Sequence, residues 1–146
     1  DRRQRQMCIR DRLWRVRGWS IGTVILTQHL VARGRFDEAA RAAAIEPELE
    51  GFLRALVEAT RSPVASPARQ QGIALTAEQR PMGLGGGIAK PAWLIYLGEP
   101  DASLDALEKL FARPVLGLET LWQPMYDPIR DHPRYQSIVD GLELPE

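Results

Sequence analysis

The chain has few of the residues that build metal sites or covalent crosslinks. It contains one cysteine, Cys8, and two histidines, His29 and His132. A single cysteine excludes an internal disulfide and is typical of a reducing compartment, so we expect a cytoplasmic location. The three side chains are also too widely spaced for a metal-ligand pattern. We therefore expect no metal ligands.

An excess of one charge and a long apolar run are missing as well. Lys+Arg and Asp+Glu both number 19, so the formal net charge is zero. This balance gives no support to binding of nucleic acid or of acidic membranes. No apolar run approaches the length of a transmembrane helix, and no signal-peptide core follows the start. We expect partners other than nucleic acids and membranes.

One stretch departs from this balance. Residues 1–17 contain seven arginines, and the chain begins at Asp1 rather than at a methionine. Residues 7–12, MCIRDR, resemble what a common transposon-end sequencing adaptor encodes, and a frayed, solvated terminus is the alternative. We expect residues 1–17 to be a disordered or artefactual N-terminal segment without a functional role.

From residue 18 onward the apolar periodicity is helical, and no segment shows sustained strand alternation. Prolines and acidic residues stand where helices are expected to begin, and glycines where they are expected to end. These signals predict helices over about 21–33, 36–45, 47–61, 67–75, 91–97 and 100–111, with a further helix near 118–122 and a glycine-rich loop over 80–87. With 45% apolar residues in 146, the chain is large enough for one all-α domain.

The predicted helices occur in pairs, and one pair recurs. Residues 30–39, LVARGRFDEA, align with residues 94–103, LIYLGEPDAS, on Gly34 and Gly98. The separation of 98 − 34 = 64 residues is close to two periods of about 34 residues. A third pair, broken near Pro63, lies between them. A repeat of this length is typical of helix–turn–helix arrays.

The recurring pair resembles the tetratricopeptide-repeat (TPR) family. Positions that match its inter-helix glycine, the small residue of its second helix and the large residue after it are Gly34, Gly98, Ala39, Ser103 and Leu107. The match is degenerate, because Ala43 and Glu46 depart from the family's sizes and the middle pair shows no clear glycine. The resemblance implies antiparallel helix-pair repeats over residues 18–121, a TPR-like α-solenoid. It further implies a concave face, formed by the first helix of each pair, that binds a protein or peptide.

The end of the chain has its own pattern. Residues 122–135 read WQPMYDPIRDHPRY, and an apolar stripe at helical spacing runs from Tyr135 to Leu142. Pro128 and Pro133 suit helix starts, and Asp127 and Asp131 stand where a carboxylate could cap them. We expect a one-turn piece and then a short helix, a capping segment over residues 122–146.

This phrase is similar to the closing segment of bacterial repeat proteins. In that group the repeats often follow a winged-helix DNA-binding domain or a nucleotide-cyclase domain. The resemblance implies the C-terminal regulatory part of a larger bacterial signalling protein or transcriptional regulator. It implies no catalytic residues and no cofactor-binding residues.

A hydrolase is the alternative function. Residues 18–22, GWSIG, fit the G-x-S-x-G nucleophile elbow of α/β-hydrolases, with Ser20 as the nucleophile. Asp101 or Asp127 followed by His132 would keep that family's order of catalytic residues. The fold needs a parallel sheet, and no buried strand pattern follows, so we interpret Ser20 as a helix cap. A structural spacer or dimerisation module is a third reading.

Two further signals are weak. Residues 83–87 and Lys90 suggest a phosphate-binding loop, but neither the P-loop nor the dinucleotide-binding spacing is met. Trp93, Tyr96 and Trp122 are more typical of a core than of a ligand platform. We expect all three aromatic side chains to be buried.

Overall fold

The computed structural model describes residues 20–77, 86–112 and 121–142. Within these ranges it consists of helices and turns, without strands, so the predicted all-α class is confirmed. The elements are α2 (Ser20–Ala32), α3 (Phe36–Ala43), α4 (Pro47–Arg61), α5 (Pro67–Ala77), α6 (Gly86–Tyr96), α7 (Pro100–Phe111), the 3₁₀ helix η3 (Pro124–Ile129) and α8 (Pro133–Asp140). None of these helices is long and apolar enough to cross a membrane.

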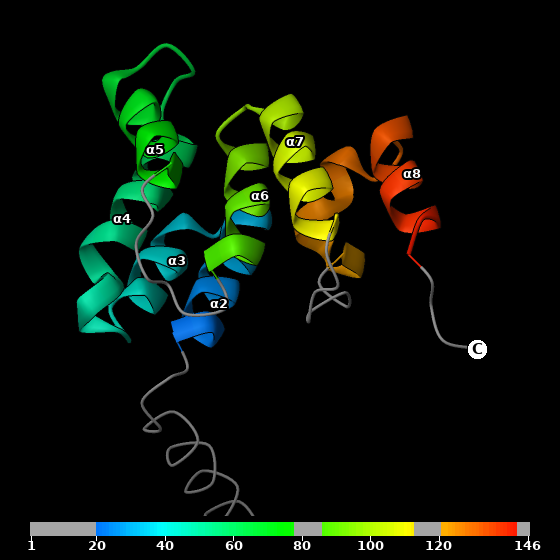
Figure 1. Ribbon diagram of the computed structural model, residues 1–146. Coiled ribbons are helices and arrows are strands. Elements are labelled where there is room, and N and C mark those ends of the chain that lie inside the picture. The colour runs from blue at the N-terminus through cyan, green and yellow to red at the C-terminus, as the bar shows by residue number, and fades with distance from the viewer. Residues whose placement is uncertain (1–19, 78–85, 113–120, 143–146) are drawn as a thin grey trace, which may run out of the picture.

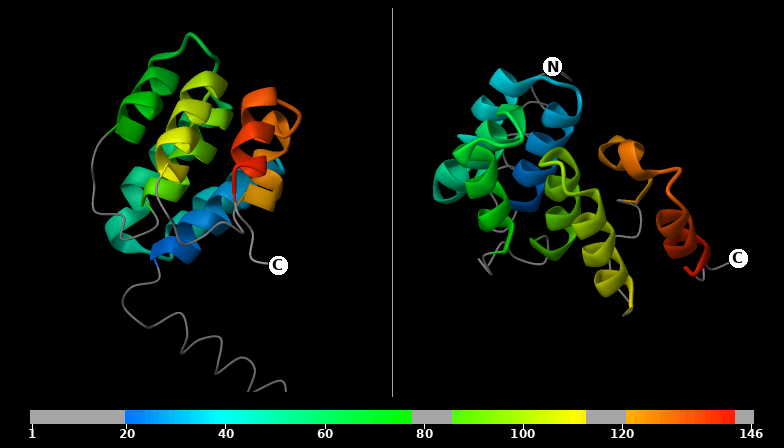
Figure 2. Two further views of the ribbon diagram at one scale, coloured as in Figure 1. Left: turned by 45° about the vertical axis from the view of Figure 1, so that its right-hand side comes forward. Right: turned by 90° about the horizontal axis from the view of Figure 1, so that it is seen from above.

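The helices pack in consecutive pairs, as a helical-repeat fold requires. The most extensive contacts join α2 to α3, α4 to α5 and α6 to α7, and α3 also packs on α4. The pair α4–α5 lies at one end of the molecule, and α8 lies at the other end (Figures 1 and 2). There α8 packs on α7, while η3 contacts α2 and α6. The C-terminal elements therefore cap the last helix pair.

The turns after α2 and α6 have the same geometry. Gly34 and Gly98 are the only described residues with positive φ, at 69° and 86°. Each glycine N–H donates to the carbonyl three residues earlier, at 2.9 and 3.1 Å. The following N–H donates five residues back, at 2.8 and 2.9 Å, which completes a Schellman motif. The 64-residue recurrence seen in the sequence is thus a recurrence of backbone structure.

The second helix of each pair carries a small buried residue against the first helix. These residues are Ala39 in α3, Gly72 in α5 and Ser103 in α7. A Cβ added at Gly72 would lie only 2.3 Å from the Cβ of Ala59 in α4. The Ser103 hydroxyl donates to the Pro91 carbonyl of α6 at 2.7 Å. The middle pair therefore has the close helix contact for which its sequence shows no clear signal.

At Gly72 we expect a glycine-to-alanine change to have the opposite effect on stability from the usual one. A glycine-to-alanine change inside a helix ordinarily stabilises by about 0.5–1 kcal/mol. At Gly72 the new methyl group meets the fixed Cβ of Ala59, so we expect Gly72→Ala to destabilise by about 1–3 kcal/mol. Gly51 in α4 is the matched control, since a Cβ there has no neighbour within 4 Å. In urea unfolding, the free energy of unfolding should fall for Gly72→Ala and rise for Gly51→Ala. An increase for both variants would contradict the close packing at Gly72.

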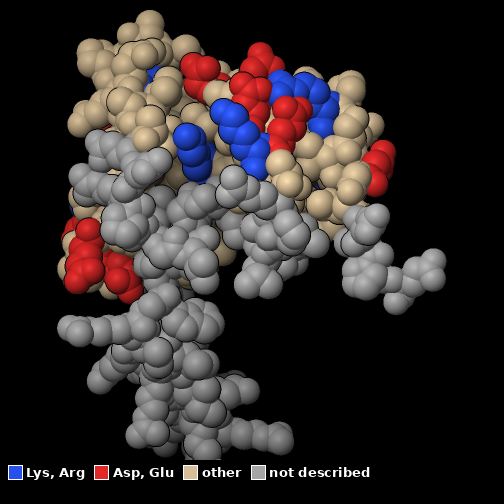
Figure 3. Space-filling model, in the orientation of Figure 1, with Lys and Arg blue, Asp and Glu red and all other residues tan. Residues whose placement is uncertain are grey.

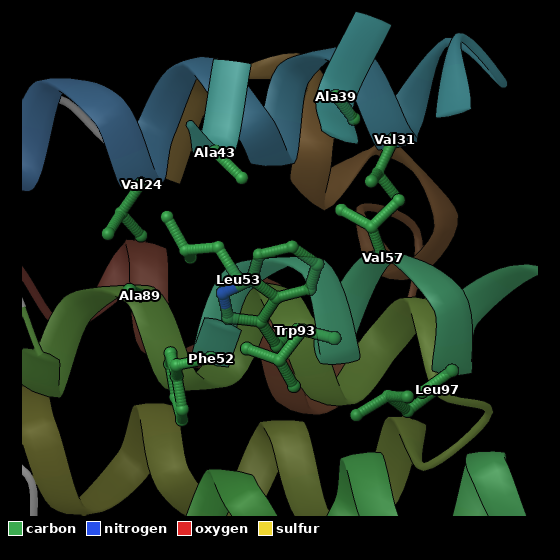
Figure 4. Close-up of a cluster of buried hydrophobic side chains, with 12 residues drawn as sticks. Val24, Val31, Ala39, Ala43, Phe52, Leu53, Val57, Ala89, Trp93 and Leu97 are labelled. Atoms are coloured by element: carbon green, nitrogen blue, oxygen red, sulfur yellow. The ribbon is translucent and has the colours of Figure 1, made fainter. Parts of the chain in front are cut away.

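Buried apolar side chains form two clusters in the part of the chain that the structure describes. The first joins α2, α3, α4 and one face of α6, with Trp93 among side chains of the other helices (Figure 4). The second joins the other face of α6, through Ala92 and Ile95, to α7, η3 and α8. Because α6 has a buried surface on both sides, its residues from Ala89 to Ile95 are all buried except Lys90. This explains its apolar sequence.

Helix α2 is also central. No described side chain between Gly22 and Ala32 is exposed, and α2 contacts α6 and η3 as well as α3 and α4. The side chain of Gln28 is 1% exposed and donates to the Ala89 carbonyl of α6 at 2.7 Å. The third pair, α6–α7, therefore packs directly on the first pair, α2–α3, through α2 and α6. In a simple row of repeats, each pair would touch only its neighbours.

Several helix bounds differ from the sequence prediction. Helix α6 begins at Gly86, so Pro91 lies inside it and the expected loop over 80–87 is shorter at its end. The 3₁₀ helix begins at Pro124, not at Pro128. Both errors come from treating each proline as a first helical residue, although an α-helix can lose one hydrogen bond at an internal proline. Residues 1–17, and most of the helix expected near 118–122, lie outside the described residues.

Candidate functional site

The capping segment is held together by Arg130. Its guanidinium donates twice to Asp127, at 2.7 and 3.0 Å, and also to the Gln123 carbonyl at 3.2 Å. A second, weaker contact reaches the Trp122 carbonyl at 3.4 Å. The sequence pattern predicts Asp127 as a helix cap, and this is wrong because its carboxylate is paired with Arg130. The ion pair closes η3 and fixes the backbone on both sides of it.

Three tyrosines stabilise this segment, and one of them, Tyr96, joins it to α6. The Tyr96 hydroxyl of α6 donates to the Met125 carbonyl at 2.9 Å, and the Tyr135 hydroxyl donates to the Leu121 carbonyl. The rings of Tyr126 and Tyr135 lie with their centroids 6.0 Å apart. Burial raises the pKa of Tyr96 to about 12, with a smaller effect from the Asp127 charge. Tyr96 therefore remains a hydrogen-bond donor well above neutral pH.

Arg134 ties α8 to α7 on the surface. Its guanidinium donates to both oxygens of Glu108 at 2.8 Å and to Asp105 at 2.6 Å. The Arg134 hydrogen bond lowers the pKa of Glu108, so this attraction is present at neutral pH and is lost as the pH falls through the lowered value. Acidic and basic side chains alternate over this part of the molecule (Figure 3). These contacts fasten the exposed side of α8 to α7.

The start of α8 is capped by a histidine. The Nδ1 atom of His132 accepts the Arg134 N–H at 3.2 Å, and Pro133 occupies the first helical position. The sequence pattern predicts a cap from Asp131, but this residue is exposed and makes no hydrogen bond with another described residue. Asp131 therefore does not cap α8. It lies on the turn between η3 and α8.

A pocket of about 310 Å³ opens between the start of the capping segment and α8. Leu121 and Tyr135 contribute to its lining, and both are almost fully buried. The more accessible lining residues include Trp122, Arg130, Asp131, Gln136, Val139 and Asp140. This volume is at the lower end of the range of about 300–1,000 Å³ for small-molecule sites. It suits one or two side chains of a partner.

Trp122 is the lining residue that sequence reasoning places wrongly. The prediction is a core position, but Trp122 is 47% exposed, whereas Trp93 is 1% exposed and Tyr96 is half-buried. Leu121 precedes Trp122 and points inward, at 1% exposure. The Leu121 carbonyl accepts from Tyr135, and the Trp122 carbonyl accepts from Arg130 at 3.4 Å. A tryptophan is thus presented beside the pocket.

Arg69 is a structural residue that the sequence does not indicate. It lies on α5, is 8% exposed, and donates to the carbonyls of Thr60 at 3.0 Å, Ser62 at 2.5 Å and Tyr96 at 2.8 Å. Helix C-termini carry partial negative charge and unpaired carbonyls, and a guanidinium satisfies both. Arg69 thus caps α4, whose turn lacks a Schellman glycine, and joins α4 to the end of α6.

The residues of the hydrolase alternative lie in different elements of the fold. Ser20 is the first residue of α2. The described residues contain no strand, so the sheet beneath a nucleophile elbow is absent from that part of the chain. Asp101 lies in the first turn of α7, while Asp127 and His132 hold the cap together. Asp127 and His132 thus both make hydrogen bonds within the cap.

The weak phosphate and metal signals gain no support. Residues 83–85 lie outside the described residues, and Gly86 and Gly87 belong to α6, which also carries Lys90. Within the described ranges no three His, Cys, Asp or Glu side chains gather where they could hold a metal ion. His29 is half-buried on α2, far along the chain from His132, and Cys8 lies outside the description.

Two of the three helices expected to form the concave face are occupied by packing, whereas α4 exposes Glu48, Arg54 and Glu58. A TPR array would present the first helix of each pair, which here means α2, α4 and α6. No described side chain of α2 is exposed, and the described part of α6 is buried or half-buried. The pocket beside Trp122 is therefore the better-defined candidate surface. Comparisons of this chain with protein-family models, with curated proteins and with solved structures find no match.

Proposed function

We propose that this chain is a TPR-like helical-repeat module that binds a protein or peptide partner. We further propose that it forms the C-terminal regulatory part of a larger bacterial signalling or transcriptional regulator in the cytoplasm. The repeated Schellman turns and the small residues between paired helices support the TPR-like assignment. The tail phrase supports the regulatory context, because each of its motif residues has a place in the cap.

One observation carries the binding function. Trp122 is nearly half exposed at the edge of a pocket whose walls are fixed by buried tyrosines and by the Arg130–Asp127 pair. Tryptophan contributes large contact areas at protein interfaces and is enriched among the residues that dominate their binding energy. A pocket whose walls are held by hydrogen bonds, with an exposed tryptophan at its edge, suits the anchoring of a partner side chain.

A selection from a random peptide library tests this function. Dodecapeptides displayed on phage are selected on the full chain and then measured individually on the wild type and on Trp122→Ala. We expect peptides that lose at least about tenfold in affinity when the indole is removed. Val64→Ala is the matched control, because Val64 is 70% exposed on the α4–α5 turn.

The control variant should bind the selected peptides as the wild type does. Failure to select any peptide would argue against the proposed function. Peptides that bind equally well to Trp122→Ala would also contradict it. Because Trp122 is exposed, its truncation should leave the fold intact, and circular dichroism of the variant checks this.

A further inference from the structure

The pocket beside Trp122 has an acidic character that points to a class of ligand. Asp131 and Asp140 both line it, both are exposed, and neither makes an ion pair with another described residue. The lining also contains a cation, Arg130, but its guanidinium is already bound to Asp127 and to two backbone carbonyls. The carboxylates of Asp131 and Asp140, which pair with no other described residue, therefore set the charge that an incoming group meets.

The position of Asp140 strengthens this character. It is the last residue of α8, where the helix dipole disfavours a negative charge. A cation placed beside Asp140 would be attracted both by its carboxylate and by the negative end of the helix dipole. The carboxylate thus costs the isolated helix some stability and favours a bound cation.

Trp122 adds a flat aromatic surface to the same pocket. An ammonium or guanidinium group over an indole face is attracted by the ring, and tryptophan is the best side chain for this interaction. Val139 supplies apolar surface for the carbon stem of a long basic side chain. The exposed indole, the carboxylates and the aliphatic wall together match the parts of a lysine or arginine side chain.

We propose that the pocket between Trp122 and α8 binds a basic side chain, lysine or arginine, of the partner peptide. This inference rests on the proposed peptide-binding function and specifies its ligand. The basic group lies over the indole and between the carboxylates of Asp131 and Asp140, and its stem contacts Val139. The volume of about 310 Å³ leaves room for that side chain and part of a neighbour.

The test uses the best peptide from the library selection, labelled with fluorescein, in anisotropy titrations. We expect the selected peptides to be enriched in lysine or arginine. The double variant Asp131→Asn, Asp140→Asn should weaken binding about fivefold or more, since two charge contacts are lost. Glu48→Gln with Glu99→Gln changes the net charge equally at exposed positions outside the pocket and should leave affinity unchanged.

Two measurements on the unmodified protein check the same point. Replacing the basic residue of the peptide by acetyl-lysine or citrulline keeps its shape and removes its charge, and should weaken binding as the double variant does. Raising the salt concentration should weaken the binding of the original peptide and have little effect on the binding of the neutral one.

The outcomes separate this inference from the function on which it rests. Peptides that require Trp122 but are insensitive to the two asparagine changes and to neutralisation would overturn the basic-side-chain ligand and leave peptide binding in place. If no peptide requires Trp122, the proposed function fails and this inference fails with it. If the Glu48→Gln, Glu99→Gln variant lost as much affinity as the Asp131→Asn, Asp140→Asn variant, the effect would be one of general charge. That result would also overturn the assignment.

Discussion

Removing α8 should expose the second core cluster and cost the protein most of its stability. A chain ending at Arg130 lacks Tyr135, which is 2% exposed, and the partly buried Ile138, Val139 and Leu142. Burial of one large side chain contributes about 1.5–3 kcal/mol, and small domains are stable by only about 5–15 kcal/mol. We expect the melting temperature to fall by roughly 10 °C or more. The shortened protein should also bind a hydrophobic dye.

A chain ending at Leu144 is the control for this truncation. It keeps all of α8, including the Tyr135 hydroxyl bond to Leu121 and the Arg134 contacts with α7. Its melting temperature should match that of the full chain. If the chain ending at Arg130 melted at the same temperature as well, α8 would be an appendage that contributes nothing to the core.

Replacing Arg69 by methionine should produce the largest effect of any single substitution considered. Methionine keeps the apolar contacts of the stem but leaves the carbonyls of Thr60, Ser62 and Tyr96 without their donor. Hydrogen bonds from a charged group are worth about 1.5–3 kcal/mol each, with incomplete additivity. We therefore expect the free energy of unfolding to fall by about 3–5 kcal/mol in a urea titration.

Arg54→Met is the matched control for Arg69. The Arg54 side chain is 52% exposed and pairs with Glu50, one turn earlier in α4. Exposed pairs of this kind contribute about 0.3–0.5 kcal/mol. Similar losses for the two variants would mean that the buried arginine does not hold α4 and α6 together.

The paired architecture is predictable because its turns use residues with few alternatives. A positive φ favours glycine so strongly that the spacing of Gly34 and Gly98, 64 residues apart, indicates a repeated turn in the sequence itself. Proline at a first helical position marks the starts of α4, α5, α7 and α8 in the same way. The capping role of Tyr135 follows from helical spacing.

The middle pair is harder to predict because its signals are of a different kind. Gly72 lies inside a helix, where glycine is read as unfavourable rather than as a point of close contact. Arg69 replaces a turn glycine, and a lone arginine in a polar stretch is usually a solvated residue. Its three carbonyl acceptors come from two helices, and only the folded chain brings them together.

The candidate site is missed by sequence reasoning for a related reason. Aromatic residues among apolar neighbours are more often buried than exposed, so the pattern around Trp122 predicts a core position. The backbone of residues 121–123 is bound by Arg130 and Tyr135, which come later in the chain, and no local pattern indicates these contacts. The burial of α2 is likewise unpredictable in detail, because it depends on which helices cross it.

Hydrogen–deuterium exchange with and without the peptide selected on the wild-type chain tests the central claim most directly. The claim is that the cap carries the binding site and that two of the three first helices, α2 and α6, are occupied by packing. We expect added peptide to protect amides of residues 121–142, with little change in α2 and α6. Protection concentrated along α2, α4 and α6, with an unchanged cap, would contradict the account and restore a concave face as the binding surface.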